Sequence, residues 1–93
     1  MNIKITEIVI DLSEWTKHFP TGCILYHCGT EVDSQYCDNA EEFIEFIDSY
    51  KDSLIPYVTD VNVIFDVYDL DNETARECAN EVWNHIHKLM YGN

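Results

Sequence analysis

Apolar and polar residues alternate along residues 2–12, and this period of two predicts a β-strand. Ile3 and Ile5 share one face of that strand. The apolar residues after Glu7 have the opposite parity, and they are Ile8, Ile10 and Leu12. This change of phase predicts a β-bulge, or a segment buried on both faces.

Residues 22–28 and 31–37 form two further predicted strands, separated by Gly29 and Thr30. A glycine in first place of a two-residue loop favours a hairpin with a type II′ turn. Residues 60–70 show the clearest alternation of the chain. Val61, Val63, Phe65 and Val67 would line one face of this last strand, with Asn62, Asp66 and Tyr68 mainly on the other.

Two segments have the 3.6-residue period of an amphipathic helix. In the first, Asp38 is the expected N-cap, with Glu41 three residues later, and Pro56 ends the helix. Its apolar stripe is Phe43, Phe46, Ile47, Tyr50 and Leu54. The second helix is expected at residues 72–91, followed by Gly92. Its buried face would be Ala75, Cys78, Ala79, Val82, Ile86 and Leu89.

The order of these elements is β-β-β-α-β-α, which predicts an α+β fold. We expect a mostly antiparallel sheet of about four strands, with two amphipathic helices packed on one of its faces. A chain of 93 residues is long enough for one domain, so residues 1–93 are expected to form a single domain. The face of the sheet opposite the helices is expected to carry some of Tyr26, Tyr36 and Tyr68, as a surface for a partner or a second copy.

The charge of the chain restricts its binding partners. Eighteen Asp and Glu residues stand against five Lys and Arg residues, a formal net charge of −13. The five bases are scattered: Lys4, Lys17, Lys51, Arg76 and Lys88. Because nucleic acids and anionic membranes are held by clustered Lys and Arg, neither is an expected direct partner. The charge instead favours fast association with a positively charged protein.

The N-terminal sequence lacks the apolar core and cleavage site of a signal peptide, and no apolar run approaches the length of a membrane span. The four cysteines are therefore expected to be free thiols in a reducing cytoplasm.

A zinc site is the first chemical hypothesis to test. His18, Cys23, His27, Cys28 and Cys37 supply ligand types, but no C-x-x-C or H-x-x-x-H pair is present. If residues 28 and 31 pair across the hairpin, Cys23 lies opposite Tyr36 and about 13 Å along the strand from His27. We therefore expect the cysteines to be small buried hydrophobic residues and predict no metal and no cofactor.

The sequence also lacks recognisable catalytic and calcium-binding motifs. The chain has no glycine-rich phosphate loop and no nucleophile elbow, and His85 and His87 point away from each other on a helix. Asp66, Asp69, Asp71 and Glu73 cluster near the last strand, but no register matches an EF-hand loop. The sequence is therefore not expected to be an enzyme.

The acidic residues are concentrated and follow helical spacing. Thirteen of the eighteen acids, but only two of the five bases, fall in residues 38–81. Glu41, Glu45, Asp48 and Asp52 would form one column opposite the apolar stripe of the first helix, and Glu73, Glu77 and Glu81 a second. The expected partner-binding residues are Glu41, Glu42, Glu45, Asp48 and Asp52, with a second patch at Asp66, Asp69, Asp71, Glu73 and Glu77.

These features favour a small inhibitor that occupies a basic, nucleic-acid-binding groove of another protein. In size, acidity and compactness the chain is similar to phage-encoded anti-CRISPR and anti-restriction proteins, which act as DNA mimics. That likeness implies a place of action in the cytoplasm of a bacterial host. An immunity protein or antitoxin that neutralises a basic nuclease toxin has the same electrostatics and is the alternative. A small enzyme or a metal-binding protein is the second alternative.

Overall fold

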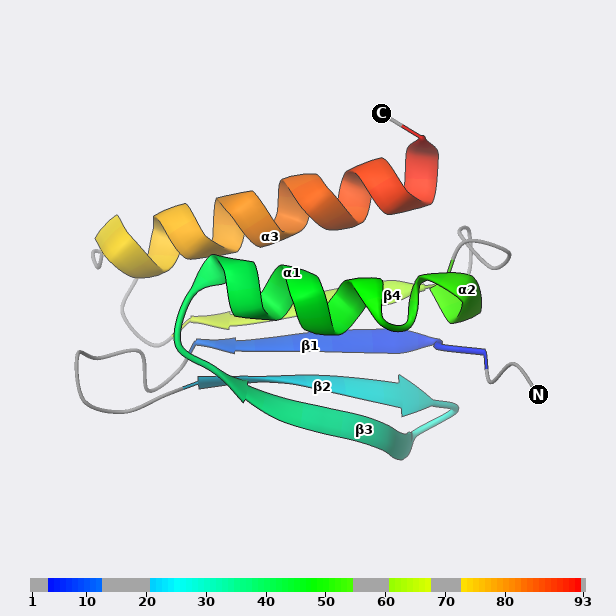
Figure 1. Ribbon diagram of the computed structural model, residues 1–93. Coiled ribbons are helices and arrows are strands. Elements are labelled where there is room, and N and C mark those ends of the chain that lie inside the picture. The colour runs from blue at the N-terminus through cyan, green and yellow to red at the C-terminus, as the bar shows by residue number, and fades with distance from the viewer. Residues whose placement is uncertain (1–3, 13–20, 55–60, 68–72, 93) are drawn as a thin grey trace.

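The computed structural model describes residues 4–12, 21–54, 61–67 and 73–92 (Figure 1). Its elements, in chain order, are β1 (Glu7–Leu12), β2 (Thr21–His27), β3 (Thr30–Cys37), α1 (Ala40–Asp48), α2 (Lys51–Leu54), β4 (Asn62–Val67) and α3 (Glu73–Tyr91). Within these residues, no helix is both long and apolar enough to cross a membrane.

The four strands form one mixed sheet in the order β3-β2-β1-β4. The β1–β2 and β2–β3 pairs are antiparallel, whereas β4 lies parallel to β1. The helices cover one face of this sheet and leave the other open (Figure 1). The α+β architecture expected from the sequence is therefore confirmed. Its mixed pairing arises because β4 follows the helices and returns in the direction of β1.

The hairpin turn lies one residue earlier than the expected Gly29-Thr30 loop. His27 pairs with Thr30, so Cys28 and Gly29 form the two-residue loop. Their φ angles are 49° and 85°, and positive values at both central positions define a type I′ turn. The type II′ prediction was wrong because the loop begins at Cys28, so Gly29 takes the second position and Cys28 itself adopts a positive φ. The shift, with an irregular register between Leu25 and Tyr26, also places Cys23 opposite Gln35 rather than Tyr36.

The expected change of phase in the first strand occurs before the ladder begins. Ile8, Ile10 and Leu12 are buried in regular alternation from Glu7 onwards. Ile5 is also fully buried, and its N–H donates to the carbonyl of Ser53 at 3.3 Å instead of continuing the strand. Ile5 therefore joins Ile8, Ile10 and Leu12 in the core, although it has the opposite parity.

The first helix begins one residue later than expected. The N-cap is Asn39, whose side chain accepts a hydrogen bond from the Glu42 N–H at 3.0 Å, and Asp38 lies outside the helix. The helix also ends early, at Asp48. The Ser49 hydroxyl donates to the Phe46 carbonyl at 2.6 Å, and the Tyr50 N–H donates to Ile47 three residues back. These local bonds compete with the helical ladder, so α2 is a separate turn.

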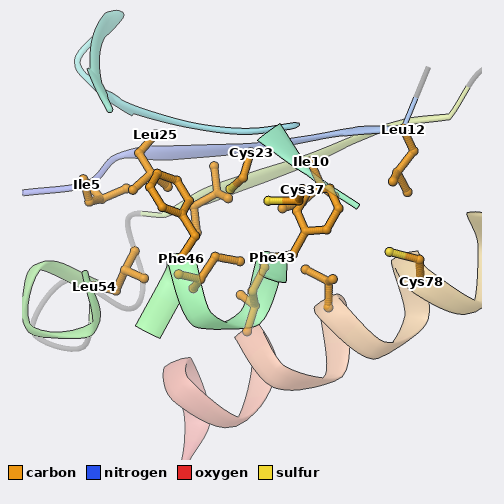
Figure 2. Packing of buried hydrophobic residues seen from close by; sticks show 14 residues of the cluster. Ile5, Ile10, Leu12, Cys23, Leu25, Cys37, Phe43, Phe46, Leu54 and Cys78 are labelled. Atoms are coloured by element: carbon orange, nitrogen blue, oxygen red, sulfur yellow. The ribbon is translucent and has the colours of Figure 1, made fainter. Parts of the chain in front are cut away.

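The core lies between the helices and the sheet (Figure 2). Fully buried isoleucine, leucine and phenylalanine side chains from both layers meet there, and they are joined by Cys23, Cys37 and Cys78. Phe43 and Ile47 of α1 pack into this cluster, as the apolar stripe predicts. Tyr50 extends the contact by donating to Asp33 of β3 at 2.6 Å. The helices are therefore attached to the sheet by one continuous apolar cluster.

Candidate acidic interface

The acids of α1 divide into two groups. Glu41 and Glu45 are exposed. Glu42 is half-buried and accepts from the Asp38 N–H at 3.4 Å, so it serves the start of the helix. Asp48 is also half-buried, and its Oδ1 lies 2.5 Å from Nε2 of His85 on α3.

The column expected on the first helix is therefore shorter than its spacing suggested. Asp48 contacts His85 of the neighbouring α3, because α1 and α3 pack side by side, and its side chain is only partly open to solvent (Figure 1). Asp52 is exposed, but it belongs to α2, beyond the break at Ser49. Glu41 and Glu45 are the two members of the column that remain exposed on one continuous helix.

The second column is present on α3. Glu73, Glu77 and Glu81 are all exposed and follow one another at intervals of four residues. In the part of the chain that the structure describes, neither these carboxylates nor Glu41 and Glu45 form a salt bridge with a Lys or Arg. The outer face of the helical layer is thus anionic, and we call these five residues the acidic helix face: Glu41, Glu45, Glu73, Glu77 and Glu81.

The other expected site residues lie elsewhere. Asp66 is exposed on β4, and its strand neighbour on β1 is Asp11. Because Phe65 contacts α3 through Trp83, the alternation of the strand turns Asp66 to the open face of the sheet. The structure therefore does not bring Asp66 onto the face that carries Glu73 and Glu77. Asp69 and Asp71 lie outside the described residues.

The open face of the sheet carries part of the expected aromatic surface. Tyr36 is 79% exposed, and Tyr26 is half-buried on the same face. Val9 and Ile24 lie between them and Ile64 of β4, which is 40% exposed. Tyr68 lies outside the described residues. Tyr26 and Tyr36 thus lie on the face of the sheet opposite the helices, as the alternation predicts.

The cysteines have the role of small core residues that the sequence suggested, with one exception. Cys23, Cys37 and Cys78 are buried, whereas Cys28 is exposed in the hairpin turn, and all four are free thiols. Burial raises the pKa of Cys37 and of Cys78 to about 11, and it raises the pKa of Cys23 still further. The buried sulfurs are therefore protonated and poorly nucleophilic near neutral pH.

Among residues 4–12, 21–54, 61–67 and 73–92, no three His, Cys, Asp or Glu side chains lie close enough together to hold an ion.

An aromatic stripe on α3 was not anticipated from the sequence. Trp83, His87 and Tyr91 follow one another at intervals of four residues, with ring centroids 6.2 and 4.7 Å apart. Trp83 also makes an edge-to-face contact with Phe65 of β4, at 6.1 Å. The same spacing rule that identified the acidic columns would have found this stripe.

Comparison with known protein families, with curated proteins and with solved structures finds no match for this chain.

Proposed function

We propose that this protein is a small acidic inhibitor that binds the nucleic-acid-binding surface of a basic partner protein. In this proposal the acidic helix face stands in for a phosphate backbone. The observation that carries it is the exposure of all five carboxylates on two adjacent helices, without a Lys or Arg partner in the described residues. A formal net charge of −13 adds a long-range field of the same sign.

The spacing of the carboxylates supports the comparison with nucleic acid. An α-helix rises about 1.5 Å per residue, so carboxylates four residues apart are separated by about 6 Å along the axis. A single DNA strand carries one phosphate per about 3.4 Å, so each column alone has about half that charge density, and the column on the neighbouring helix adds to it.

Repulsion between neighbouring carboxylates also argues that these acids do more than keep the protein soluble. Like charges four residues apart on a helix destabilise it by about 0.2–0.5 kcal/mol per pair. A surface that serves only solubility mixes charges of both signs. Residues 73–81 hold Glu73, Glu77 and Glu81 but one base, Arg76, which forms no salt bridge with them in the described residues. A function for this excess of negative charge explains why the cost of repulsion is retained.

A competition experiment tests the proposal. The immobilised protein is exposed to lysate of the host cell, and captured proteins are challenged with duplex DNA and with heparin. We expect a nucleic-acid-binding protein that either polyanion releases, and that a variant carrying Glu45→Lys and Glu77→Lys fails to capture. The matched control carries Glu7→Lys and Glu31→Lys, which change the net charge equally on the sheet side. Capture that neither polyanion reverses would contradict the proposal.

The identity of the captured protein separates the two forms of inhibitor. A defence nuclease or its DNA-binding subunit fits an anti-CRISPR or anti-restriction role in the cytoplasm of a bacterial host. A nuclease toxin encoded beside the gene fits an immunity protein or antitoxin. Both are basic, so the electrostatics of the acidic helix face suit either.

A further inference from the structure

Strand β4 forms one edge of the sheet, and its outer side is open among the described residues. The Asn62 N–H donates to the Thr6 carbonyl of the β1 side at 2.9 Å. In a parallel ladder the N–H and C=O groups of successive residues point to opposite sides of the strand. Asn62 and Ile64 therefore bond toward β1, and the backbone groups of Val63 and Phe65 point outward. Such an edge is a template for an added strand.

Apolar side chains border this edge on both sides of the sheet. On the helical side, an open groove between β4 and α3 is lined by Val63, Phe65, Ala79, Asn80 and Trp83. Its volume is about 350 Å³, at the lower end of the range for small-molecule pockets. On the open side, Ile64 is 40% exposed. Because the side chains of a strand alternate between faces, an added strand would place one set in the groove and the other beside Ile64.

We propose that the edge of β4 is a second binding site, which takes an extended Lys- or Arg-bearing segment of a partner protein as an additional strand. Backbone hydrogen bonds to Val63 and Phe65 would hold the segment, and the groove at Trp83 would select an apolar side chain. This site is separate from the acidic helix face, so it does not depend on the function proposed for that face.

Charge identifies the occupant. On the open face of the sheet, exposed Asp66 near the end of β4 lies beside its strand neighbour Asp11 of β1, so two acids flank this edge. A second copy of the chain would bring the same acids, and another net charge of −13, against this edge. A basic segment complements it instead.

Two synthetic peptides test the proposal. One alternates Lys with Val over about ten residues, and the other alternates Glu with Val; each strand would then present one apolar and one charged face. Amide hydrogen exchange of the ¹⁵N-labelled protein is followed by NMR. We expect the basic peptide to slow exchange of the Val63 and Phe65 amides by about tenfold or more, which corresponds to at least about 1.4 kcal/mol. The acidic peptide should leave exchange unchanged.

Variants establish where the peptide binds. Val63→Pro removes an outward N–H without removing a bond to β1, a position where a strand tolerates proline. Trp83→Ala removes the side chain that lines the groove, and it shows where the peptide binds if the proline variant does not fold. Each of the two variants should weaken binding of the basic peptide by about tenfold. Tyr36→Ala, on the opposite edge strand, is the control and should bind as the wild type.

Three outcomes would overturn the proposal. The first is the absence of protection at Val63 and Phe65 with the basic peptide. The second is equal binding of the two peptides. The third is a concentration-dependent dimer in sedimentation that Val63→Pro abolishes, which would show that a second copy occupies the edge.

Discussion

His85 of α3 and Asp48 of α1 meet through a contact of 2.5 Å between Nε2 and Oδ1. Their side chains are 25% and 43% exposed, so the contact lies at the surface of the seam between the two helices. It is the one polar side-chain contact between α1 and α3 in the described residues. The contact joins the two helices that carry the acidic helix face.

The first prediction is that this pair is coupled but weak. Asp48→Ala and His85→Ala should each lower the free energy of unfolding, and the coupling between them should be about 0.2–1 kcal/mol, the usual value for exposed ion pairs. A double-mutant cycle by urea denaturation at neutral pH measures that coupling. Strictly additive effects would mean that the apolar core alone positions α1 against α3.

The second prediction concerns the start of α1. Asn39→Ala should destabilise the protein by about 1 kcal/mol, because the Glu42 N–H loses its capping oxygen. Asp38→Ala should cost less than about 0.5 kcal/mol, as is usual for a surface residue without a structural role. Urea denaturation of both variants is the measurement. A larger loss of unfolding free energy in Asp38→Ala than in Asn39→Ala would show that Asp38 is the N-cap.

Periodicity was sufficient to predict the order of the four strands and the two longer helices, but not the separate turn α2. A strand or helix that is buried on one face carries apolar residues at the period of that element. The alternation in residues 61–66 and the stripe through Phe43 and Ile47 are two such patterns. The predicted hairpin turn and the predicted N-cap of the first helix are each one residue away from the observed ones. The reason is that the residues beside Cys28 and Asn39 are equally suitable for those positions. Local backbone geometry decides between such neighbours, and composition does not record it.

The candidate site was predicted less well, for a tertiary reason. Helical spacing places Glu41, Glu45 and Asp48 on one side of a helix, but it does not say which side a second helix will cover. Asp48 contacts His85 in the seam between α1 and α3, and His85 lies 37 residues away in the chain. Likewise, alternation assigned Asp66 to a face of β4, but the pairing of β4 with β1 determined what lies beside it.

The third prediction concerns thiol reactivity. At about pH 8 in the folded protein, a disulfide-exchange reagent should label Cys28 rapidly, because Cys28 is exposed in the hairpin turn. Cys23, Cys37 and Cys78 should react only on unfolding, since they are buried and their pKa values are raised. Mass spectrometry counts the labels. Rapid labelling of Cys37 in the native state would contradict its place in the core.

The same pKa shifts give stability a defined pH dependence. Above about pH 8.5 the unfolded chain releases thiol protons that the folded state retains, so the unfolded state binds fewer protons and stability falls as pH rises. The fall should continue toward the folded pKa of about 11 for Cys37 and Cys78. Urea midpoints across this range should decline less in a Cys78→Ala variant than in wild type.

The fourth prediction concerns the hairpin turn. Cys28→Asn should stabilise the protein by about 0.5 kcal/mol or more, because Asn-Gly is the preferred pair for a type I′ turn. Gly29→Ala should destabilise it, since a φ of 85° strains any side chain, even though the space around Gly29 is open. Thermal denaturation compares the two variants. Equal melting temperatures for all three proteins would argue against this turn type.

The last prediction tests the acidic helix face by association kinetics with a captured basic partner. Stopped-flow measurements across a salt series compare the wild type, the Glu45→Lys and Glu77→Lys double variant, and the Glu7→Lys and Glu31→Lys control. The helix-face variant should associate about tenfold more slowly at low salt and converge with the wild type at high salt, because steering depends on local charge and is screened. The sheet-side control should change little. Equal slowing by the two variants would show that net charge alone matters, and would contradict a phosphate-like surface on α1 and α3.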